Sequence, residues 1–336
     1  MSLESLWQEI SADPDRPTVG YLSRRVGVDA PCDMRAAIEF PAGLRVLLIG
    51  VPSGPLARAG KLPRSAGIEV SQVSMPQPRQ GHATVAVRLT DARYADIFTV
   101  VGDDLTRHLG RAADGPAAAE ALMSRLRKWQ QFLDKTPPDG LGPIVQQGLY
   151  GELRLLSMLI GTSIGARATV EAWVGPQAAN QDFQFPSAAV EVKTTTSKMH
   201  QTLEIASERQ LDPVGVVHLF IFHLSLDERP GGGDTLPALV AAIRSSLSST
   251  PIVAETFESR LLDAGYLDIH APLYVGTGYT VRQTNFFRVS GDFPRIIEAD
   301  LRTGVGAVRY SISVAACVPF GTEEAAVIDA ISEVLP

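Results

Sequence analysis

Three short charged segments in the middle of the sequence have the residue types and spacing that metal-assisted hydrolysis needs. Glu152 is followed by Asp182 and then by the triplet Glu191-Val192-Lys193, and the whole set spans fewer than fifty residues. Successive side chains of a strand point to opposite faces, so Glu191 and Lys193 are expected on one face. Burying two carboxylates and an ammonium on a half-buried strand is costly, and a divalent metal among the carboxylates offsets that cost. The pattern therefore predicts a metal-dependent nuclease site.

The residue types also indicate which ion such a site would hold. Asp182 and Glu191 lie nine residues apart across an expected turn, so an antiparallel hairpin would bring their polar faces together. Two carboxylates, together with the Val192 carbonyl, suit Mg²⁺, which keeps several waters and binds phosphate oxygens. We expect Mn²⁺ to substitute for it. Glu152 would bind a second ion or orient a water, and Lys193 would position the attacking water or stabilise the transition state.

Each of these residues also has a purely structural interpretation. A single Glu-x-Lys triplet on a strand is usually a solvated face, and Asp182 could cap a turn beside Asn180. Glu152 could be a helix-rim acid paired with Arg154. The combination favours the metal site, because an acid inside an apolar helix arc needs a partner and the strand triplet supplies one.

Three further polar residues follow the triplet and are candidates for contact with a substrate. Gln210 lies in an expected short helix, where a capping or surface role competes with a phosphate contact. Lys198 and Arg209 lie near the triplet in sequence and could touch a DNA backbone, or could be ordinary surface residues.

Composition excludes several other classes of protein. The 336 residues carry a formal net charge of −7, which argues against a general basic coat for nucleic acid but allows a local cationic groove. The two cysteines, Cys32 and Cys317, form neither a zinc ligand set nor a disulfide framework. No secretory signal is evident, and the longest apolar run, 214–226, is too short to span a bilayer. We therefore expect a soluble cytoplasmic protein that does not bind membranes.

The pattern of hydrophobic residues predicts two domains. Residues 1–136 should form a small antiparallel β-rich domain with a loose or helical lead-in over 1–34 and a helical linker at its end. A Pro-Pro-Asp-Gly break follows, and residues 140–336 should form the second domain.

The second domain carries the candidate site. It should contain the following elements in order: a helix over 143–160, strands over 168–174, 182–185 and 188–194, a short helix over 207–211, a buried strand over 214–224, a helix over 236–247 and a strand-rich C-terminal part. The fold class is thus α+β or α/β, with a core order of helix, three strands, helix and strand.

These segments resemble a known family. The order Glu…Asp…Glu-x-Lys is similar to that of the PD-(D/E)XK nucleases, which have the restriction-endonuclease-like fold, and more narrowly to a bacterial group within it. The matching segments are Gly148–Leu153, Trp173–Pro176, Asp182-Phe183, Glu191–Thr195, Gln210–Asp212, Gly265-Tyr266 and Phe293–Ile296. The similarity runs from about residue 40 to about residue 320. One departure is that Gln181, rather than proline, precedes Asp182.

The resemblance implies an αβββαβ core, Mg²⁺, and hydrolysis of DNA phosphodiester bonds. It also implies a setting in restriction or phage defence, with an ATPase or a methyltransferase as partner proteins. Our first hypothesis is accordingly a Mg²⁺-dependent DNA endonuclease. The alternative is a catalytically inactive subunit of the same fold that binds DNA or a partner, and a third is a structural protein whose acids are salt-bridged. The sequence is also compatible with a homodimer.

Overall fold

The computed structural model describes residues 2–26, 30–75 and 80–333. The chain divides into two compact units, Met1–Asp139 and Gly140–Pro336. Residues 27–29 of the predicted lead-in lie outside the described residues. Within the described ranges, no helix combines the length and the apolar character that crossing a membrane requires.

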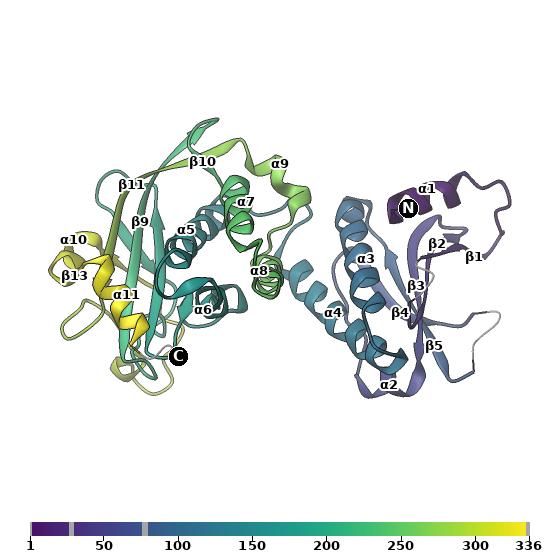
Figure 1. The fold of residues 1–336 in the computed structure, drawn as a ribbon, viewed down its shortest axis with the longest axis horizontal. Helices are drawn as coiled ribbons and strands as arrows, with labels where there is room; N and C mark the ends of the chain where they lie inside the picture. Colours follow the sequence, from purple (N-terminus) through teal and green to yellow (C-terminus); the bar gives the residue numbers. More distant parts are fainter. Residues whose placement is uncertain (1, 27–29, 76–79, 334–336) are drawn as a thin grey trace. The chain divides into compact units, whose positions relative to one another are not determined.

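The first unit is built on a five-stranded sheet in the order β1-β2-β3-β5-β4, with helices against one face (Figure 1). Its helices and strands are α1 (Leu3–Ala12), β1 (Gly20–Arg25), β2 (Asp33–Phe40), β3 (Leu44–Pro52), α2 (Ser53–Arg58), β4 (Ile68–Val73), β5 (His82–Leu89), α3 (Ala95–Gly110) and α4 (Gly115–Lys135). All neighbouring strands pair antiparallel, which confirms the predicted antiparallel sheet. The loose or helical lead-in expected over 1–34 is confirmed in its helical part by α1, but it is wrong at β1, which is a regular strand of the sheet.

Helix α4 and the segment between α2 and β4 line a cavity of about 840 Å³ in the first unit. Lys61, Arg64 and Arg127 contribute cationic side chains, and the lining contains no acidic residue. Arg127 donates a hydrogen bond to the Ala59 carbonyl, which ties this segment to α4.

The second unit contains a mixed, six-stranded sheet. Its helices are α5 (Pro143–Ile160), α6 (Gly165–Ala172), α7 (Leu236–Leu247), α8 (Pro251–Asp263), α9 (Ala271–Tyr274), α10 (Val314–Cys317) and α11 (Glu324–Ser332). Its strands are β6 (Phe183–Gln184), β7 (Ala188–Thr195), β8 (Thr202–Ile205), β9 (His218–Pro230), β10 (Asp234–Thr235), β11 (Thr277–Arg288), β12 (Tyr310–Ser313) and β13 (Gly321–Thr322). The sheet order is β10-β11-β9-β7-β6, with β13 beside β11, while β8 and β12 form a separate pair. Only the β7–β9 pairing within the described sheet is parallel.

The sheet has a different layer on each face. One face packs against α5, α6, α7 and α8, and the long strands β9 and β11 run past these helices in Figure 1. The opposite face packs against the β8–β12 pair through Leu203, Ile205 and Ile312. Strand β9 lies between β7 and β11, which explains why its sequence is an almost continuous apolar run.

Several predicted elements of this unit are confirmed. Helix α5 begins at Pro143, whose fixed backbone angle suits a first helical position, and it runs to Ile160 as expected. Helix α7 also has the predicted bounds, and the Thr235 hydroxyl caps it by accepting from the Ala238 N–H (3.2 Å). Strands β6 and β7 form the predicted antiparallel hairpin, with Phe183 opposite Val190.

Other predicted elements are wrong. Residues 168–174, expected as a strand, lie mostly in helix α6, because a short alternating run that is rich in alanine fits a helix as well as a strand. Residues 208–211 form turns rather than a helix. The predicted αβββαβ order is therefore not confirmed. The C-terminal part, which was expected to be strand-rich, also contains helix α9, and its strand β12 gives way to helix α10 at Val314.

Candidate functional site

Asp182 is fixed at the start of the β6–β7 hairpin through both its main chain and its side chain. Its carbonyl accepts hydrogen bonds from the N–H groups of Val174 and Gly175, both at 2.9 Å. Its Oδ2 accepts from the Val192 N–H at 2.8 Å. The carboxylate is thereby held against strand β7, beside the backbone between Glu191 and Lys193.

Glu191, Lys193 and Gln210 form one hydrogen-bonded group on the face of β7 that looks away from α5. Glu191 Oε1 accepts from Lys193 Nζ at 2.8 Å and from Gln210 Nε2 at 2.7 Å. Gln210 Oε1 in turn accepts from Lys193 Nζ at 3.1 Å and from the Ala206 N–H at 2.8 Å. The Lys193 ammonium therefore has two oxygen partners, and the amide orientation of Gln210 is set by its own two contacts.

Glu152 reaches this region from α5. Its Oε2 accepts a hydrogen bond from Trp173 Nε1 at 2.7 Å, and the indole is fully buried. A Cβ atom added at Gly175 would lie 2.6 Å from Asp182 Oδ1 and 3.1 Å from Glu152 Oε2. One methyl-sized position at Gly175 is therefore next to both carboxylates, which shows that Glu152 and Asp182 are neighbours.

The electrostatics of these acids reflect burial and mutual repulsion. Burial, and then the nearby Asp182 carboxylate, raise the pKa of Glu152 well above its usual value, against the lowering effect of the Trp173 hydrogen bond. Burial also raises the pKa of Asp182, although the Val192 N–H and Lys193 oppose it. Burial, and then Asp182, raise the pKa of Glu191 to about 8, against the attraction of Lys193. All three carboxyl groups would be stabilised by additional positive charge.

The donor set fits a hard divalent cation. Glu191 is 2% exposed, and its Oε2 is buried without a hydrogen-bond partner among the described residues. A buried unpaired carboxylate oxygen is costly unless a ligand satisfies it. Within the described ranges, no three His, Cys, Asp or Glu side chains form a ligand cage on their own. Mg²⁺ does not require such a cage, because it usually takes only one or two carboxylates and completes its shell with water and phosphate.

The structure thus brings together five of the residues singled out in the sequence, namely Glu152, Asp182, Glu191, Lys193 and Gln210. Val192 contributes its N–H to Asp182, and a metal-binding role for its carbonyl stays a prediction. The other two candidates lie elsewhere. Arg209 extends toward Glu298 (3.8 Å) with 57% of its side chain exposed, and Lys198 contacts Asp227 (3.7 Å).

Two residues that shape the site were not assigned to it from the sequence. Trp173 is fully buried in the core of the second unit, and its N–H also orients Glu152. Gly175 allows the two acids to approach each other, and it lies in the segment 173–176 that carried the family resemblance. The resemblance over residues 173–176 was a signal for both, but the hydrogen-bond partner of an indole cannot be deduced from sequence spacing.

Comparison with known proteins gives one result. A family model described as "Putative PD-(D/E)XK family member, (DUF4420)" matches residues 3–315, a range that contains the whole candidate site. No curated protein and no solved structure matches the chain. Because the family model spans nearly the entire sequence, this chain belongs to the DUF4420 family.

Proposed function

We propose that this chain is a metal-dependent nuclease with a restriction-endonuclease-like core that hydrolyses DNA phosphodiester bonds at the Glu152–Asp182–Glu191–Lys193 site. The observation that carries the proposal is the buried, unpartnered Oε2 of Glu191 in a cluster of three acids and one lysine. Such an arrangement calls for a cation, and Lys193 supplies only one charge. Membership of a PD-(D/E)XK-type family supports the same conclusion.

Each side chain has a distinct part in this proposal. Asp182 and Glu191 would hold Mg²⁺, or Mn²⁺ in its place, which when bound activates water and neutralises charge on phosphoryl oxygens. Lys193 is held 2.8 Å from Glu191 and 3.1 Å from Gln210, so its ammonium is oriented to stabilise negative charge at the phosphate. Glu152, fixed by Trp173, would orient a water or accept a proton from it.

A catalytically inactive DNA- or partner-binding subunit is the second candidate function. The observation in its favour is that Lys193 is engaged by Glu191 and Gln210, and that the described residues contain no complete ligand cage. Titration calorimetry separates the two functions. An inactive module need not take up Mg²⁺ or Mn²⁺, whereas the nuclease requires uptake that is lost in Asp182→Ala and Glu191→Ala.

The direct test is cleavage of plasmid and linear DNA by the purified protein with Mg²⁺. Lys193→Ala, Asp182→Ala and Glu191→Ala should each reduce the rate by about 10²- to 10³-fold or more, the usual effect of losing one charge-stabilising group. Glu204→Ala, an exposed acid on β8, is the matched control and should cut normally. Cutting at the wild-type rate by all three site variants would rule out the proposed site.

We further propose that the first unit supplies a second contact for the nucleic acid. Its 840 Å³ cavity combines Lys61, Arg64 and Arg127 with the amides of Gln130 and Gln131, a set that suits phosphate oxygens. Defence proteins such as an ATPase or a methyltransferase remain the proposed partners, on the strength of the family resemblance described above.

A further inference from the structure

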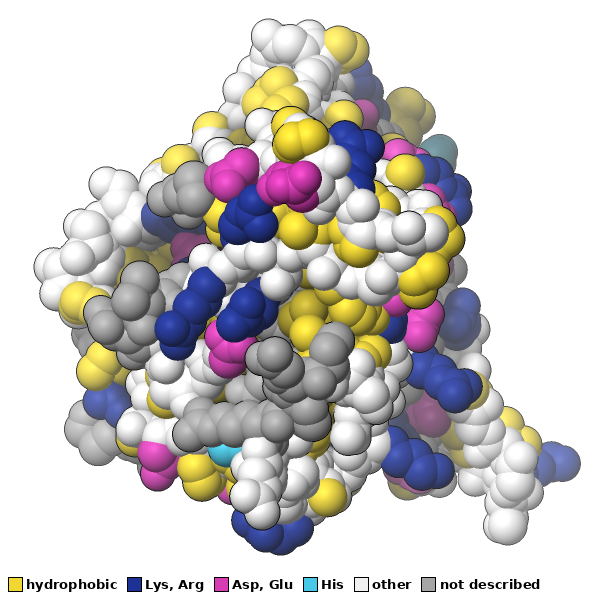
Figure 2. Space-filling model, turned by 90° about the vertical axis from the view of Figure 1, so that its right-hand side faces the viewer, with side chains coloured by type: hydrophobic (Ala, Val, Ile, Leu, Met, Phe, Trp, Pro, Cys, Tyr) yellow, Lys and Arg dark blue, Asp and Glu magenta, His cyan; other side chains and the backbone are white. Residues whose placement is uncertain are grey.

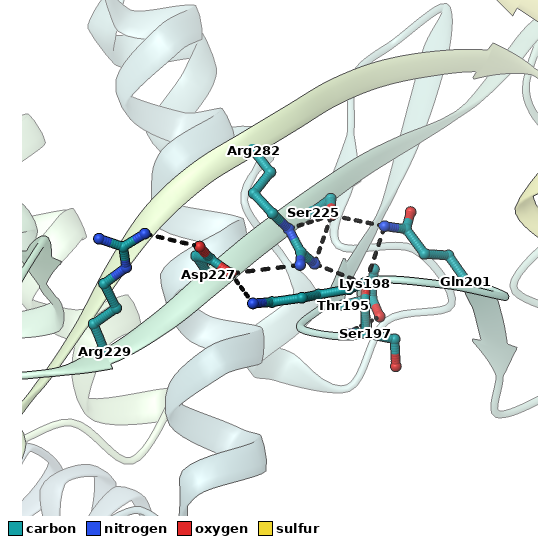
Figure 3. A network of polar contacts seen from close by, with 8 residues as sticks. All are labelled: Thr195, Ser197, Lys198, Gln201, Ser225, Asp227, Arg229 and Arg282. Carbon is teal, nitrogen blue, oxygen red and sulfur yellow. Dashed lines mark hydrogen bonds and ion pairs between the residues drawn. The ribbon is translucent and has the colours of Figure 1, made fainter.

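Three cationic side chains surround one carboxylate further along the sheet face that carries Glu191 and Lys193. Asp227, on β9, lies 3.1 Å from Arg229 Nη2, 3.5 Å from Arg282 Nη1 and 3.7 Å from Lys198 Nζ (Figure 3). We call these four residues the Asp227 cluster. With three positive charges against one negative, it is a local cationic excess in a unit that has 13 Lys and Arg against 21 Asp and Glu.

Arg282 also holds the loop that carries Lys198. Its Nη2 donates to the Ser197 carbonyl at 2.7 Å, and its Nε and Nη2 donate to Ser225 Oγ at 3.2 and 2.9 Å. Gln201 Nε2 donates to the same two partners, Ser197 O at 3.0 Å and Ser225 Oγ at 2.9 Å (Figure 3). The loop between β7 and β8 is thereby fixed at both of its ends.

The backbone of β11 is shaped so that Arg282 can do this. The pairing of β11 with β9 is regular up to Val281 and resumes at Gln283, so Arg282 is the extra residue of a β-bulge. Bulges commonly redirect one side chain, and they occur often next to functional sites. Arg282 thereby reaches Asp227, Ser225 and Ser197 together.

The cluster continues the sheet face on which Glu191 and Lys193 lie. Lys193 pairs with His223 and Thr195 with Ser225, so Asp227 is the next residue along this face of β9. Four residues of strand separate His223 from Asp227, which is about 13 Å. That length equals the rise of about four base pairs along the axis of a DNA duplex.

An ordinary stabilising role accounts poorly for the two outer cations. Lys198 is 77% exposed and Arg229 64% exposed, and exposed ion pairs contribute only about 0–1 kcal/mol to stability. We propose that the Asp227 cluster binds backbone phosphates of the DNA that flanks the candidate site, with Arg282 as the positioning residue of the Lys198 loop. This inference rests on the nuclease function proposed above.

The test measures DNA binding without cleavage. A fluorescein-labelled duplex of about 30 base pairs is titrated with the full chain in EDTA, and anisotropy is recorded over a range of salt concentrations. Lys198→Ala combined with Arg229→Ala should lower the affinity about tenfold. It should also reduce the slope of the logarithm of the binding constant against the logarithm of the salt concentration by the equivalent of up to about two phosphate contacts. Asp227→Asn should raise the affinity, because it removes the competing carboxylate. A merely structural cluster would not give these opposite signs.

Two further variants complete the design. Arg167→Ala, on α6, removes a cation that is 81% exposed and is the matched control, with no expected change. Arg282→Lys keeps the charge but loses the forked contacts to Ser197 and Ser225. It should weaken DNA binding severalfold while its unfolding midpoint stays close to that of the wild type, as a positioning role requires.

The outcomes separate this inference from the proposed function. Wild-type affinity in the double variant, or no gain in Asp227→Asn, overturns the role of the cluster. If Lys193→Ala still abolishes cutting in that case, the nuclease function stands without it. A wild-type chain that binds no DNA at any salt concentration in EDTA also overturns the role of the cluster, whereas failure to cut DNA with Mg²⁺ overturns the nuclease function.

Discussion

The missing side chain of Gly175 is what allows two acids of the candidate site to be neighbours. A methyl group there would lie 2.6 Å from Asp182 Oδ1, closer than real Cβ contacts come. Because Asp182 is also held by the Val192 N–H, it cannot move away without breaking that hydrogen bond. The geometry of the carboxylates therefore depends on a residue that has no functional group.

Gly175→Ala should accordingly lower the affinity for Mn²⁺ by about 10- to 100-fold, the usual effect of displacing a metal ligand through its surroundings. Titration calorimetry and the DNA cleavage rate provide the measurement. Gly276→Ala is the control, because a Cβ at that position would meet nothing within 4 Å. Unchanged metal uptake in Gly175→Ala would show that Asp182 is not a ligand.

His223 provides a second prediction at this scale. It is fully buried on β9, and burial lowers its pKa to about 4, against about 6.5 in an unfolded chain. The folded state therefore binds fewer protons between these values, so the contribution of this histidine is complete above about pH 6.5 and is lost as the pH falls toward 4.

Chemical denaturation at pH 7 and pH 4.5 measures this effect. His223→Gln should lose less stability over that range than the wild type, by up to about 3 kcal/mol. Asn285 donates a hydrogen bond to His223 Nδ1 at 3.1 Å, and the side-chain oxygen of the new glutamine can accept the same hydrogen bond. His82→Gln, at the first residue of β5, should show the same dependence of stability on pH as the wild type. Equal dependence in all three proteins would contradict the prediction.

The shared face of Glu191 and Lys193 was predictable because side chains alternate along a strand, while Glu152 and Asp182 were predicted from their order in the family resemblance. The sequence also supplied Gln210 as a candidate. It could not supply the contacts that orient these groups, such as Trp173 with Glu152, since those depend on the fold of the segment between α5 and β6. The direction of the Arg209 side chain could not be predicted for the same reason, because a turn rather than a helix sets it, and its contact with a substrate stays a prediction.

At the scale of elements, helix α5 approaches strand β7 unusually closely through Gly151. A Cβ at this residue would lie 2.1 Å from Thr194 Cγ2 and 3.3 Å from Val192 Cγ1. The next residue along the helix is Glu152, so this contact sets the height of that carboxylate above the sheet. The absence of a side chain at Gly151 thus serves both packing and the site.

Gly151→Ala should destabilise the protein by about 1–3 kcal/mol, as overpacking of a filled core does. Thr194→Ser removes the obstructing methyl group while keeping the hydroxyl that accepts from Gln147 (3.2 Å). The double variant should therefore recover much of the loss, and urea denaturation of all four proteins in the cycle gives the coupling energy. Additive effects would mean that the two groups do not meet.

Elements with a strong periodic pattern were predictable, and short ones were not. Helices α5 and α7 and the β6–β7 hairpin follow from apolar spacing and from proline or threonine at the start. Helix α6 was mistaken for a strand because eight residues contain too few turns to distinguish the two periods. Strand β8 was not expected, since its only described sheet partner is β12, more than a hundred residues away.

At the scale of the whole molecule, charge is distributed unequally between the two units. Residues 1–139 carry 17 Lys and Arg against 16 Asp and Glu, whereas residues 140–336 carry 13 against 21. On the face drawn in Figure 2, basic, acidic and hydrophobic side chains are interleaved, and no broad area carries charge of a single sign. On the face that Figure 2 draws, affinity for a polyanion would therefore come from small cationic sites.

Lys61→Ala combined with Arg64→Ala, in the cavity of the first unit, should lower the affinity for duplex DNA severalfold. It should also reduce the slope of binding affinity against salt concentration by the equivalent of up to about two phosphate contacts. The same anisotropy assay applies. Arg93→Ala with Lys135→Ala removes two exposed cations of the same unit and is the matched control. Equal loss in both double variants would indicate a general charge effect rather than a binding cavity.

The bulge in β11 changes which residue numbers face which layer. Before it, Tyr279 and Val281 face the helices; after it, the even-numbered Phe286 does, and the odd-numbered Phe287 faces the β8–β12 pair. Deleting Arg282 alone would leave every remaining side chain on its present side and restore an uninterrupted ladder. A one-codon deletion here should thus be tolerated by the fold, whereas the same deletion two codons later would close the ladder only by turning Gln283 from the face of Ser225 to the face of Leu224, toward the helices.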